Sequence, residues 1–186
     1  MSGMAAISDN EPQLVREAAA GDTTAFDALV LRHAKPVYRL ALRMLGSRED
    51  AEDVQQETFF CAYRGLRRFR GDASFGTWVY SIAARLCVTK LRRAARRPEE
   101  THAELELASA SPDGDPEERL LAVELAGRVQ KALAQLSPND RLLIVLKHVE
   151  QLSHGEIAAI LDCSVESSRS RLARATRLFR EAYERM

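Results

Sequence analysis

The C-terminal stretch of the sequence carries its clearest chemistry, a series of arginines at helical spacing. Six arginines lie between residues 169 and 185, against only Glu181 and Glu184. Small and apolar residues at spacings of three and four mark the face that would dock this helix: Ser168, Leu172, Ala175, Leu178, Phe179 and Ala182. The opposite face and its flanks carry Glu166, Ser170, Arg174, Arg177, Arg169, Arg171 and Arg180. Because guanidinium groups bind phosphates and guanine edges, this face predicts DNA contact, with a merely solvated basic helix as the alternative.

A shorter helix in front of this one completes a known pattern. Ser153, with Glu156 three residues later, forms the S-x-x-E capping box that starts a helix, and apolar residues continue to Leu161. The periodicity breaks at Asp162, which tolerates the left-handed conformation of a tight turn, and Ser164 can cap the next helix. A short helix, a three-residue break and a longer helix are typical of a helix-turn-helix, whose second helix enters the major groove of DNA.

A second basic segment is interleaved with aromatic residues. Between residues 64 and 97 there are ten basic residues and one acid, Asp72. The aromatic residues among them are Phe69, Phe75, Trp78 and Tyr80. Arginines bind phosphates and aromatic rings can stack on bases, so the segment indicates a nucleic-acid binder. The alternative is that Phe75, Trp78 and Val79 are core residues, and for Trp78 the core is favoured.

The net charge is zero because Lys+Arg 27 equal Asp+Glu 27, but the signs are segregated. Eight acids and no Lys or Arg lie between residues 99 and 118, in a stretch that also holds prolines and small residues and is typical of a linker. Four more acids, Asp50, Glu52, Asp53 and Glu57, share a predicted helix, where they face either a basic partner or water. Blocks of opposite sign indicate a nucleic-acid binder with an acidic partner or self-screening segment; ordinary solvated faces are the alternative.

Helical periodicity runs through the rest of the chain and predicts an all-α fold. One helix, capped by Asp22 or Thr23, ends at Gly46, the next opens at 47–50, and a third spans about 75–95. Further on, Ser137 followed by Pro138 predicts another helix start. Two apolar stripes flank that start: Leu120, Leu121, Leu125, Val129, Leu133 and Leu136 before it, and Leu142, Leu143, Val145, Leu146 and Val149 after it. We therefore expect two small helical domains, residues 12–97 and 117–186, joined by an acidic flexible linker at 98–116.

Several function classes find no support in the sequence. Cys61, Cys87 and Cys163 form no CxxC pair, which predicts a reducing compartment and no zinc site, and the four histidines have no metal-ligand spacing. No nucleophile motif or glycine-rich phosphate loop is present, so we expect neither an enzyme nor a cofactor. The N-terminus lacks the pattern of a signal peptide and no apolar run is long enough to span a membrane, which predicts a cytoplasmic protein.

Three segments resemble one family when they are taken in order. They are AGDTTAFDALVLRH, DAEDVQQETFFCAYRGLRRFRGDASFGTWVYSIA and LSPNDRLLIVLKHVEQLSHGEIAAILDCSVESSRSRLARA. Together they resemble the sigma factors of bacterial RNA polymerase, in the extracytoplasmic-function (ECF) group. The resemblance covers residues 12–97 and 117–186 and implies that the two domains correspond to sigma regions 2 and 4.

The resemblance also implies a role for each surface. The acidic helix would bind core RNA polymerase through Asp50, Glu52, Asp53, Gln56 and Glu57. Recognition and melting of the promoter −10 element would fall to Phe69, Arg70, Gly71, Asp72, Ala73, Ser74, Phe75, Arg85, Thr89, Arg92 and Arg93. The −35 element would be read by Glu166, Ser167, Arg169, Ser170, Arg171, Ala173, Arg174 and Arg177. Family members often have Gly-Thr-Val at 166–168, a bulky residue at 173 and Asn at 85, so the resemblance implies the family role but not the promoter sequence that is read.

The resemblance further implies an anti-sigma factor as inhibitor, besides core polymerase and promoter DNA as partners. A stand-alone helix-turn-helix regulator is the main alternative, but it leaves the acidic helix and the aromatic-basic segment unused. A hydrolase or transferase lacks its motifs, and a purely interacting adaptor does not need the arginine-bearing face.

Overall fold

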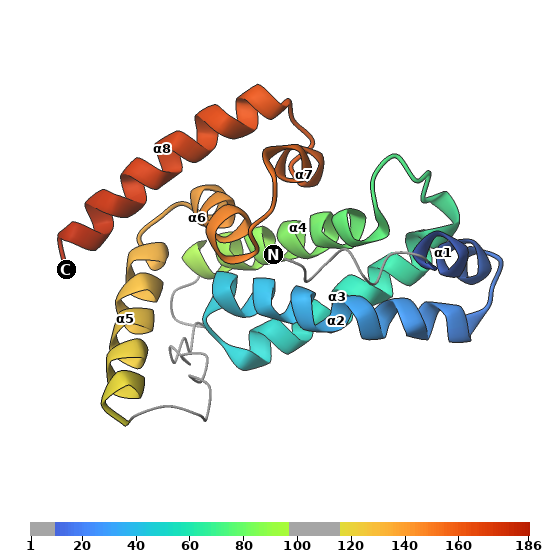
Figure 1. The fold of residues 1–186 in the computed structure, drawn as a ribbon, viewed down its shortest axis with the longest axis horizontal. Helices are drawn as coiled ribbons and strands as arrows, with labels where there is room; N and C mark the ends of the chain where they lie inside the picture. The colour runs from blue at the N-terminus through green and yellow to red at the C-terminus, as the bar shows by residue number, and fades with distance from the viewer. Residues whose placement is uncertain (1–9, 97–115) are drawn as a thin grey trace.

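The computed structural model describes residues 10–96 and 116–186, and within these ranges every regular element is a helix (Figure 1). The predicted linker lies outside the described residues except at Pro116, where helix α5 already begins. The all-α prediction is confirmed, and the capping residues that the sequence indicated stand at the helix ends.

The N-terminal unit contains α1 (Glu11–Ala19), α2 (Thr23–Leu45), α3 (Arg48–Gly65), the 3-10 turn η2 (Leu66–Arg68) and α4 (Phe75–Arg96). Asp22 caps α2 by accepting hydrogen bonds from the backbone N–H groups of Thr24 and Ala25. Gly46 ends that helix with a left-handed φ of 76°, and Ser47 caps α3. Helix α1 was not predicted from the pattern. It packs along α2.

The core of this unit lies where α2, α3 and α4 meet, and its largest side chains are fully enclosed. Leu29, Leu40 and Met44 of α2 are 0% exposed, as are Val79 and Cys87 of α4. Burial raises the pKa of the Cys87 thiol to about 12, so this cysteine behaves as a small core residue.

The C-terminal unit contains α5 (Pro116–Ala134), α6 (Pro138–Ile144), the π-helical turn η4 (Val145–Val149), α7 (His154–Ile160) and α8 (Val165–Glu184). Ser137 caps α6, Ser153 and Glu156 form a reciprocal capping box at α7, and Ser164 caps α8. Helix α8 packs across α5, α6 and α7. The three helix starts in this unit therefore stand where the capping residues predicted them.

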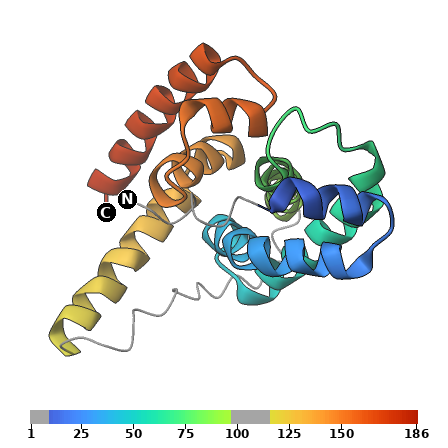
Figure 2. The same cartoon turned by 45° about the vertical axis from the view of Figure 1, so that its right-hand side comes forward.

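The two predicted apolar stripes are buried only in part. Leu133 and Leu146 are buried, but Leu120, Leu121 and Leu125 are 61%, 64% and 54% exposed. The first turns of α5 project away from the other helices (Figure 2), so the stripe continues beyond the surface that could cover it. At the end of η4, Val149 is also partly exposed, at 36%.

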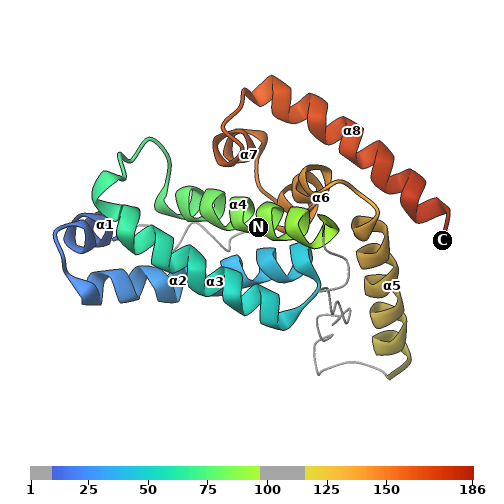
Figure 3. The ribbon, with the colours of Figure 1, turned by 180° about the vertical axis from the view of Figure 1, so that it is seen from behind.

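The two units pack directly against each other, which the expectation of domains joined by a flexible linker did not include. Helix α4 lies between the α2–α3 pair and the α6–α7 pair (Figure 3). Gln130 and the buried Arg141 donate hydrogen bonds to the backbone carbonyls of Arg43 and Met44, respectively. These carbonyls belong to the last turn of α2 and lack partners within the helix, so donors from the other unit supply their hydrogen bonds. Burial lowers the pKa of Arg141 to about 10, still well above neutral pH.

Candidate nucleic-acid interface

The helix-turn-helix is formed as the sequence predicted. Helix α7 ends at Ile160, Asp162 takes a left-handed φ of 49°, and α8 begins after Ser164, whose side chain accepts from the backbone N–H of Ser167 at 3.1 Å. The docking face of α8 is the predicted one, because Ser168, Leu172, Ala175 and Ala182 are all buried. The turn therefore fixes which side of α8 remains open to a ligand.

The open side of α8 carries the predicted −35 residues along the outer edge of the molecule (Figure 1). All but one of them are exposed: Glu166, Arg169, Ser170, Arg171, Ala173, Arg174 and Arg177, with Ser167 half-buried beside the cap. Two arginines on this side have ion-pair partners. Arg177 lies 3.8 Å from Glu181 on the same helix, and Arg174 donates to the buried Asp140 of α6 at 2.7 Å.

The loop between η2 and α4 borders the second predicted site. It forms a cavity of about 300 Å³ that is lined by the backbone and side chains of residues 68–73, by Thr77, Trp78 and Ser81 of α4, and by Ala159 of α7. Gly71 supports the loop with a φ of 76°, and Arg70 pairs with Asp72 at 3.1 Å. The volume is at the lower end of small-molecule pockets, which suits the capture of a single base.

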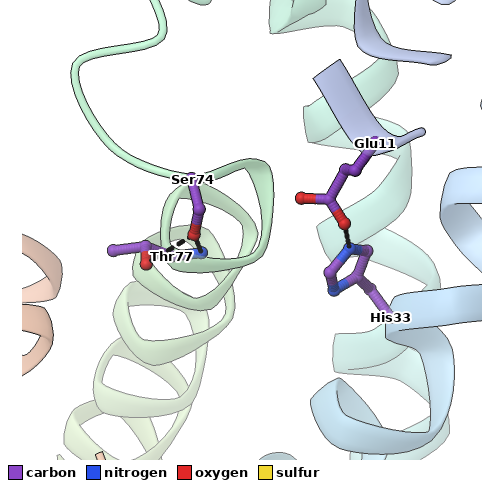
Figure 4. Close-up of polar contacts among 4 residues, drawn as sticks. All are labelled: Glu11, His33, Ser74 and Thr77. Atoms are coloured by element: carbon purple, nitrogen blue, oxygen red, sulfur yellow. Dashed lines mark hydrogen bonds and ion pairs between the residues drawn. The ribbon is translucent and has the colours of Figure 1, made fainter. Parts of the chain in front are cut away.

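The loop joins α4 through a hydrogen-bonded cap. Ser74 accepts from the backbone N–H of Thr77 at 3.1 Å, and its hydroxyl lies 2.9 Å from the Thr77 hydroxyl (Figure 4). Ser74 itself was among the predicted −10 residues, and here it fixes the first turn of α4. The polar edge of the cavity at Thr77 is therefore fixed to the start of a rigid helix.

The aromatic residues of this segment divide between core and rim. Phe75 is only 2% exposed and contacts the rings of His33, Phe69 and Trp78. The prediction that the Phe75 side chain contacts DNA is therefore corrected: it is a core residue, because it begins α4 with its ring pointing into the helix junction. Phe69 and Trp78 are half-buried, and their rings contact each other in a tilted arrangement with 4.9 Å between ring centroids.

A basic strip continues along α4 beyond the cavity. Arg85, Thr89, Arg92 and Arg93 are all exposed, at the helical spacing that places them on neighbouring turns of one side. The Thr89 hydroxyl donates to the backbone carbonyl of Arg85 at 2.7 Å, so it bonds its own helix.

Lys90 of the same helix is engaged differently. Its ammonium lies 2.6 Å from Asp50 and 3.1 Å from Asp53 of α3. Burial disfavours its charged form, but hydrogen bonds to these two carboxylates outweigh that effect and raise the pKa of Lys90. Two of the acids predicted to bind core polymerase, Asp50 and Asp53, are therefore paired with the helix predicted to contact the −10 element. Glu52, Gln56 and Glu57 remain exposed.

Two polar clusters near these surfaces were missed by sequence reasoning. His33 of α2 bonds Glu11 of α1 at 2.8 Å (Figure 4), and a Cβ on Gly76 would lie 3.0 Å from the His33 ring. This explains the glycine in the first turn of α4, where it otherwise weakens a helix. No spacing rule joins these three residues, since they come from three helices.

The other missed cluster lies between the two units. Glu150 follows η4, and its side chain is only 2% exposed. One carboxylate oxygen accepts from the Tyr80 hydroxyl at 2.8 Å and from the Arg39 guanidinium at 3.1 Å. Burial, followed by the charge of Glu150, raises the pKa of Tyr80, which keeps this hydroxyl a donor at all physiological pH values.

Within the described residues, no cluster of three His, Cys, Asp or Glu side chains could hold a metal ion. None of the helices described there has the length and apolar character needed to cross a membrane.

Comparison with known proteins finds one family over most of the chain. The model of Sigma-70 region 2 matches residues 29–97, and the model of Sigma-70, region 4 matches residues 126–178. The RNA polymerase sigma-H factor of Pseudomonas aeruginosa is 35% identical over 175 residues, covering 90% of each chain. The ECF RNA polymerase sigma-E factor of Escherichia coli (strain K12) is 38% identical over 169 residues, covering 87% of this chain and 88% of that protein.

Solved structures show the same fold. CnrH, in complex with the cytosolic domain of CnrY, superposes with a TM-score of 0.70 at 27% identity, covering 95% of this chain and 98% of that one. The sigma factor RpoE of Bartonella quintana, in complex with the anti-sigma factor NepR, gives a TM-score of 0.62 at 21% identity, covering 86% and 96%. The chain therefore belongs to the family of RNA polymerase sigma factors, in the ECF group. Sigma factors are transcription initiation factors.

Proposed function

We propose that this chain binds core RNA polymerase and directs it to promoters by contacting two separate DNA elements. Residues 12–97 bind the polymerase and recognise and melt the −10 element. Residues 117–186 recognise the −35 element, and residues 98–116 connect the two units. The protein acts in the cytoplasm, where the polymerase and the promoters are.

The observation that carries the proposal is the exposed side of α8. A helix-turn-helix holds this helix by its apolar face and leaves arginine, serine and glutamate side chains open. This is the combination that reads base edges and phosphates in a major groove. Arg169, Arg171 and Arg177 suit phosphates, while Glu166, Ser170 and Arg174 lie four residues apart on one line that can face the bases.

The cavity beside α4 supports the assignment of the −10 element. A melted strand needs a pocket for a flipped base, rings against which neighbouring bases can stack, and cations along its phosphates. The loop cavity, which Ala159 of α7 also borders, the half-buried Phe69 and the exposed Arg85, Arg92 and Arg93 supply these along the loop and α4.

The acidic side of α3 supports binding to a basic surface of the polymerase. Glu52, Asp53, Gln56 and Glu57 are exposed on successive turns, and Asp50 is half-buried next to them. Among these, Asp50 and Asp53 are partly neutralised by Lys90, so Glu52 and Glu57 present the uncompensated charge.

We further propose that an anti-sigma factor controls this chain. The Bartonella quintana relative of the same fold is described in complex with one. In this chain the exposed leucines of α5 offer an apolar surface that such a partner could cover.

The direct test is transcription in vitro from a library of genomic fragments, with core polymerase in the presence and absence of this protein. Sequencing of the RNA 5′ ends should reveal protein-dependent start sites that share two upstream elements. No new start sites, together with tight binding of duplex DNA by the protein alone, would contradict the proposal and favour a stand-alone regulator.

A further inference from the structure

A buried carboxylate lies directly beneath the DNA-facing side of α8. Asp140 of α6 is 3% exposed as a residue and its side chain is 4% exposed. One carboxylate oxygen accepts from the Ser137 hydroxyl at 2.6 Å, and the other accepts from the Arg174 guanidinium at 2.7 Å. A buried carboxylate needs such partners, because removal of a charge from water without pairing is strongly unfavourable.

The partner is not itself buried. The Arg174 side chain remains 59% exposed, and it makes no other hydrogen bond to any residue that the structure describes. Only one terminal nitrogen, Nη2, is drawn toward the interior. The remaining N–H groups stay at the surface in the planar arrangement that allows an arginine to bond two acceptors at once.

The other arginines on this side are held less firmly. Arg177 pairs with Glu181 at 3.8 Å, and both side chains are well exposed, at 72% and 51%. Such an exposed pair restricts an arginine little. Arg169 and Arg171 are exposed and have no ion pair within the described parts of the chain. Among these DNA-facing arginines, Arg174 is thus the one whose direction is set from beneath.

We propose that Asp140 is a positioning residue for promoter recognition: it orients the Arg174 guanidinium so that its free edge reads one base of the −35 element. The inference rests on the proposed function and adds a specificity-determining pair to it. The guanidinium of an arginine can donate two hydrogen bonds to one guanine, at O6 and N7, so guanine is the expected base. Because the side chain is already ordered by Asp140, less conformational freedom is lost when it binds.

The test uses holoenzyme assembled from core polymerase and the full chain, on one promoter from the library and its single-base variants across the −35 element. The measured quantity is the ratio of initiation between the preferred base and each alternative. R174A should abolish the preference at one position, where a paired arginine contact is worth about 5- to 150-fold. D140N should weaken the preference at that same position by about 3- to 10-fold, and the double variant should show no further loss.

Two controls separate positioning from stability. S137A removes the other contact of Asp140 and the cap of α6 but leaves the Arg174 pair, so it should lower the unfolding temperature without changing the base preference. R174K keeps a charge beside Asp140 and should keep the fold, yet lose the preference because an ammonium lacks the planar pair of donors.

Results that contradict the role of Asp140 differ from the result expected if the proposed function is wrong. If D140N lowers the unfolding temperature but leaves the preference at the Arg174 position intact, Asp140 is structural only and the inference is wrong. A uniform loss with every promoter variant would assign Arg174 to a phosphate and would also overturn it. Absence of initiation by the wild-type holoenzyme on all promoters would instead contradict the proposed function itself.

Discussion

The two proposed DNA-contacting surfaces are built in opposite ways. On α8, the contacting side chains stand on one rigid helix whose opposite face packs on the other helices, and among them Arg174 also pairs with the buried Asp140 of α6. At the loop before α4, Phe69 and Trp78 line the cavity and pack against the hydrophobic core, to which the neighbouring Phe75 belongs. On α8, the contact residues other than Arg174 can therefore be exchanged without loss of the fold, whereas exchange of the aromatic residues at the loop disturbs the core.

Replacement of Phe75 should give the largest effect and tests the second half of this comparison. Because Phe75 is 2% exposed, Phe75→Ala should destabilise the protein by about 3–5 kcal/mol, through lost burial and the cavity left behind. Phe69→Ala, at a half-buried position in the same aromatic group, is the matched control with a smaller effect. Urea denaturation followed by circular dichroism measures both. Equal losses for the two variants would contradict the division into core and rim.

Arg141 tests whether the two units are stabilised by their packing. Arg141→Met keeps most of the side chain's volume but leaves the carbonyls of Met44 and Leu133 without this donor. We expect a loss of about 2–4 kcal/mol, because buried acceptors lose their partner. Lys131→Met, at an exposed position on α5, is the control and should change little. A Met variant as stable as the wild type would mean that the units separate readily in solution.

The arginines of α8 test the first half of the comparison. Arg169→Ala and Arg177→Ala should each change the free energy of unfolding by no more than about 0.5 kcal/mol, since exposed ion pairs contribute little. The same variants should weaken holoenzyme binding to every promoter by a similar factor and reduce its salt dependence, as expected for phosphate contacts. A large loss of stability would show that this face, too, belongs to the fold.

The smallest effect concerns pH and the start of α2. Hydrogen bonds from the Thr24 side chain and then from the backbone N–H groups of Ala25 and Thr24 lower the pKa of Asp22 from its usual 3.8. Since the folded pKa lies below the unfolded one, the cap contributes fully above pH 3.8 and its contribution is lost as pH falls through the folded pKa. The unfolding temperature of Asp22→Asn should therefore fall less steeply with acid than that of the wild type.

The sequence predicted most helix boundaries and the α8 surface because both depend on local chemistry. A capping side chain bonds backbone groups two or three residues away, and helical periodicity relates residues three and four apart, so Asp22, Ser137, Ser153 and Ser164 indicate helix starts by themselves. The exposed and buried sides of α8 follow from the same periodicity. The helix-turn-helix and its arginine-bearing side are therefore predictable from neighbouring residues alone.

Contacts between residues distant in the chain were decided by the tertiary structure alone. The core position of Phe75, the pairing of Lys90 with Asp50 and Asp53, and the burial of Glu150 against Tyr80 each join separate helices. The leucines of α5 were predicted as part of an apolar stripe but are exposed. A helical apolar stripe does not say how far the surface that covers it extends. Asp140 and Arg174, which lie 34 residues apart in the chain, show both what the sequence decides and what the tertiary structure decides. The sequence by itself determined that Arg174 faces outward, because helical periodicity sets the side of the helix on which a residue lies. Only the packing of α6 against α8 decided which buried charge pairs with Arg174, because no local rule fixes how two helices meet.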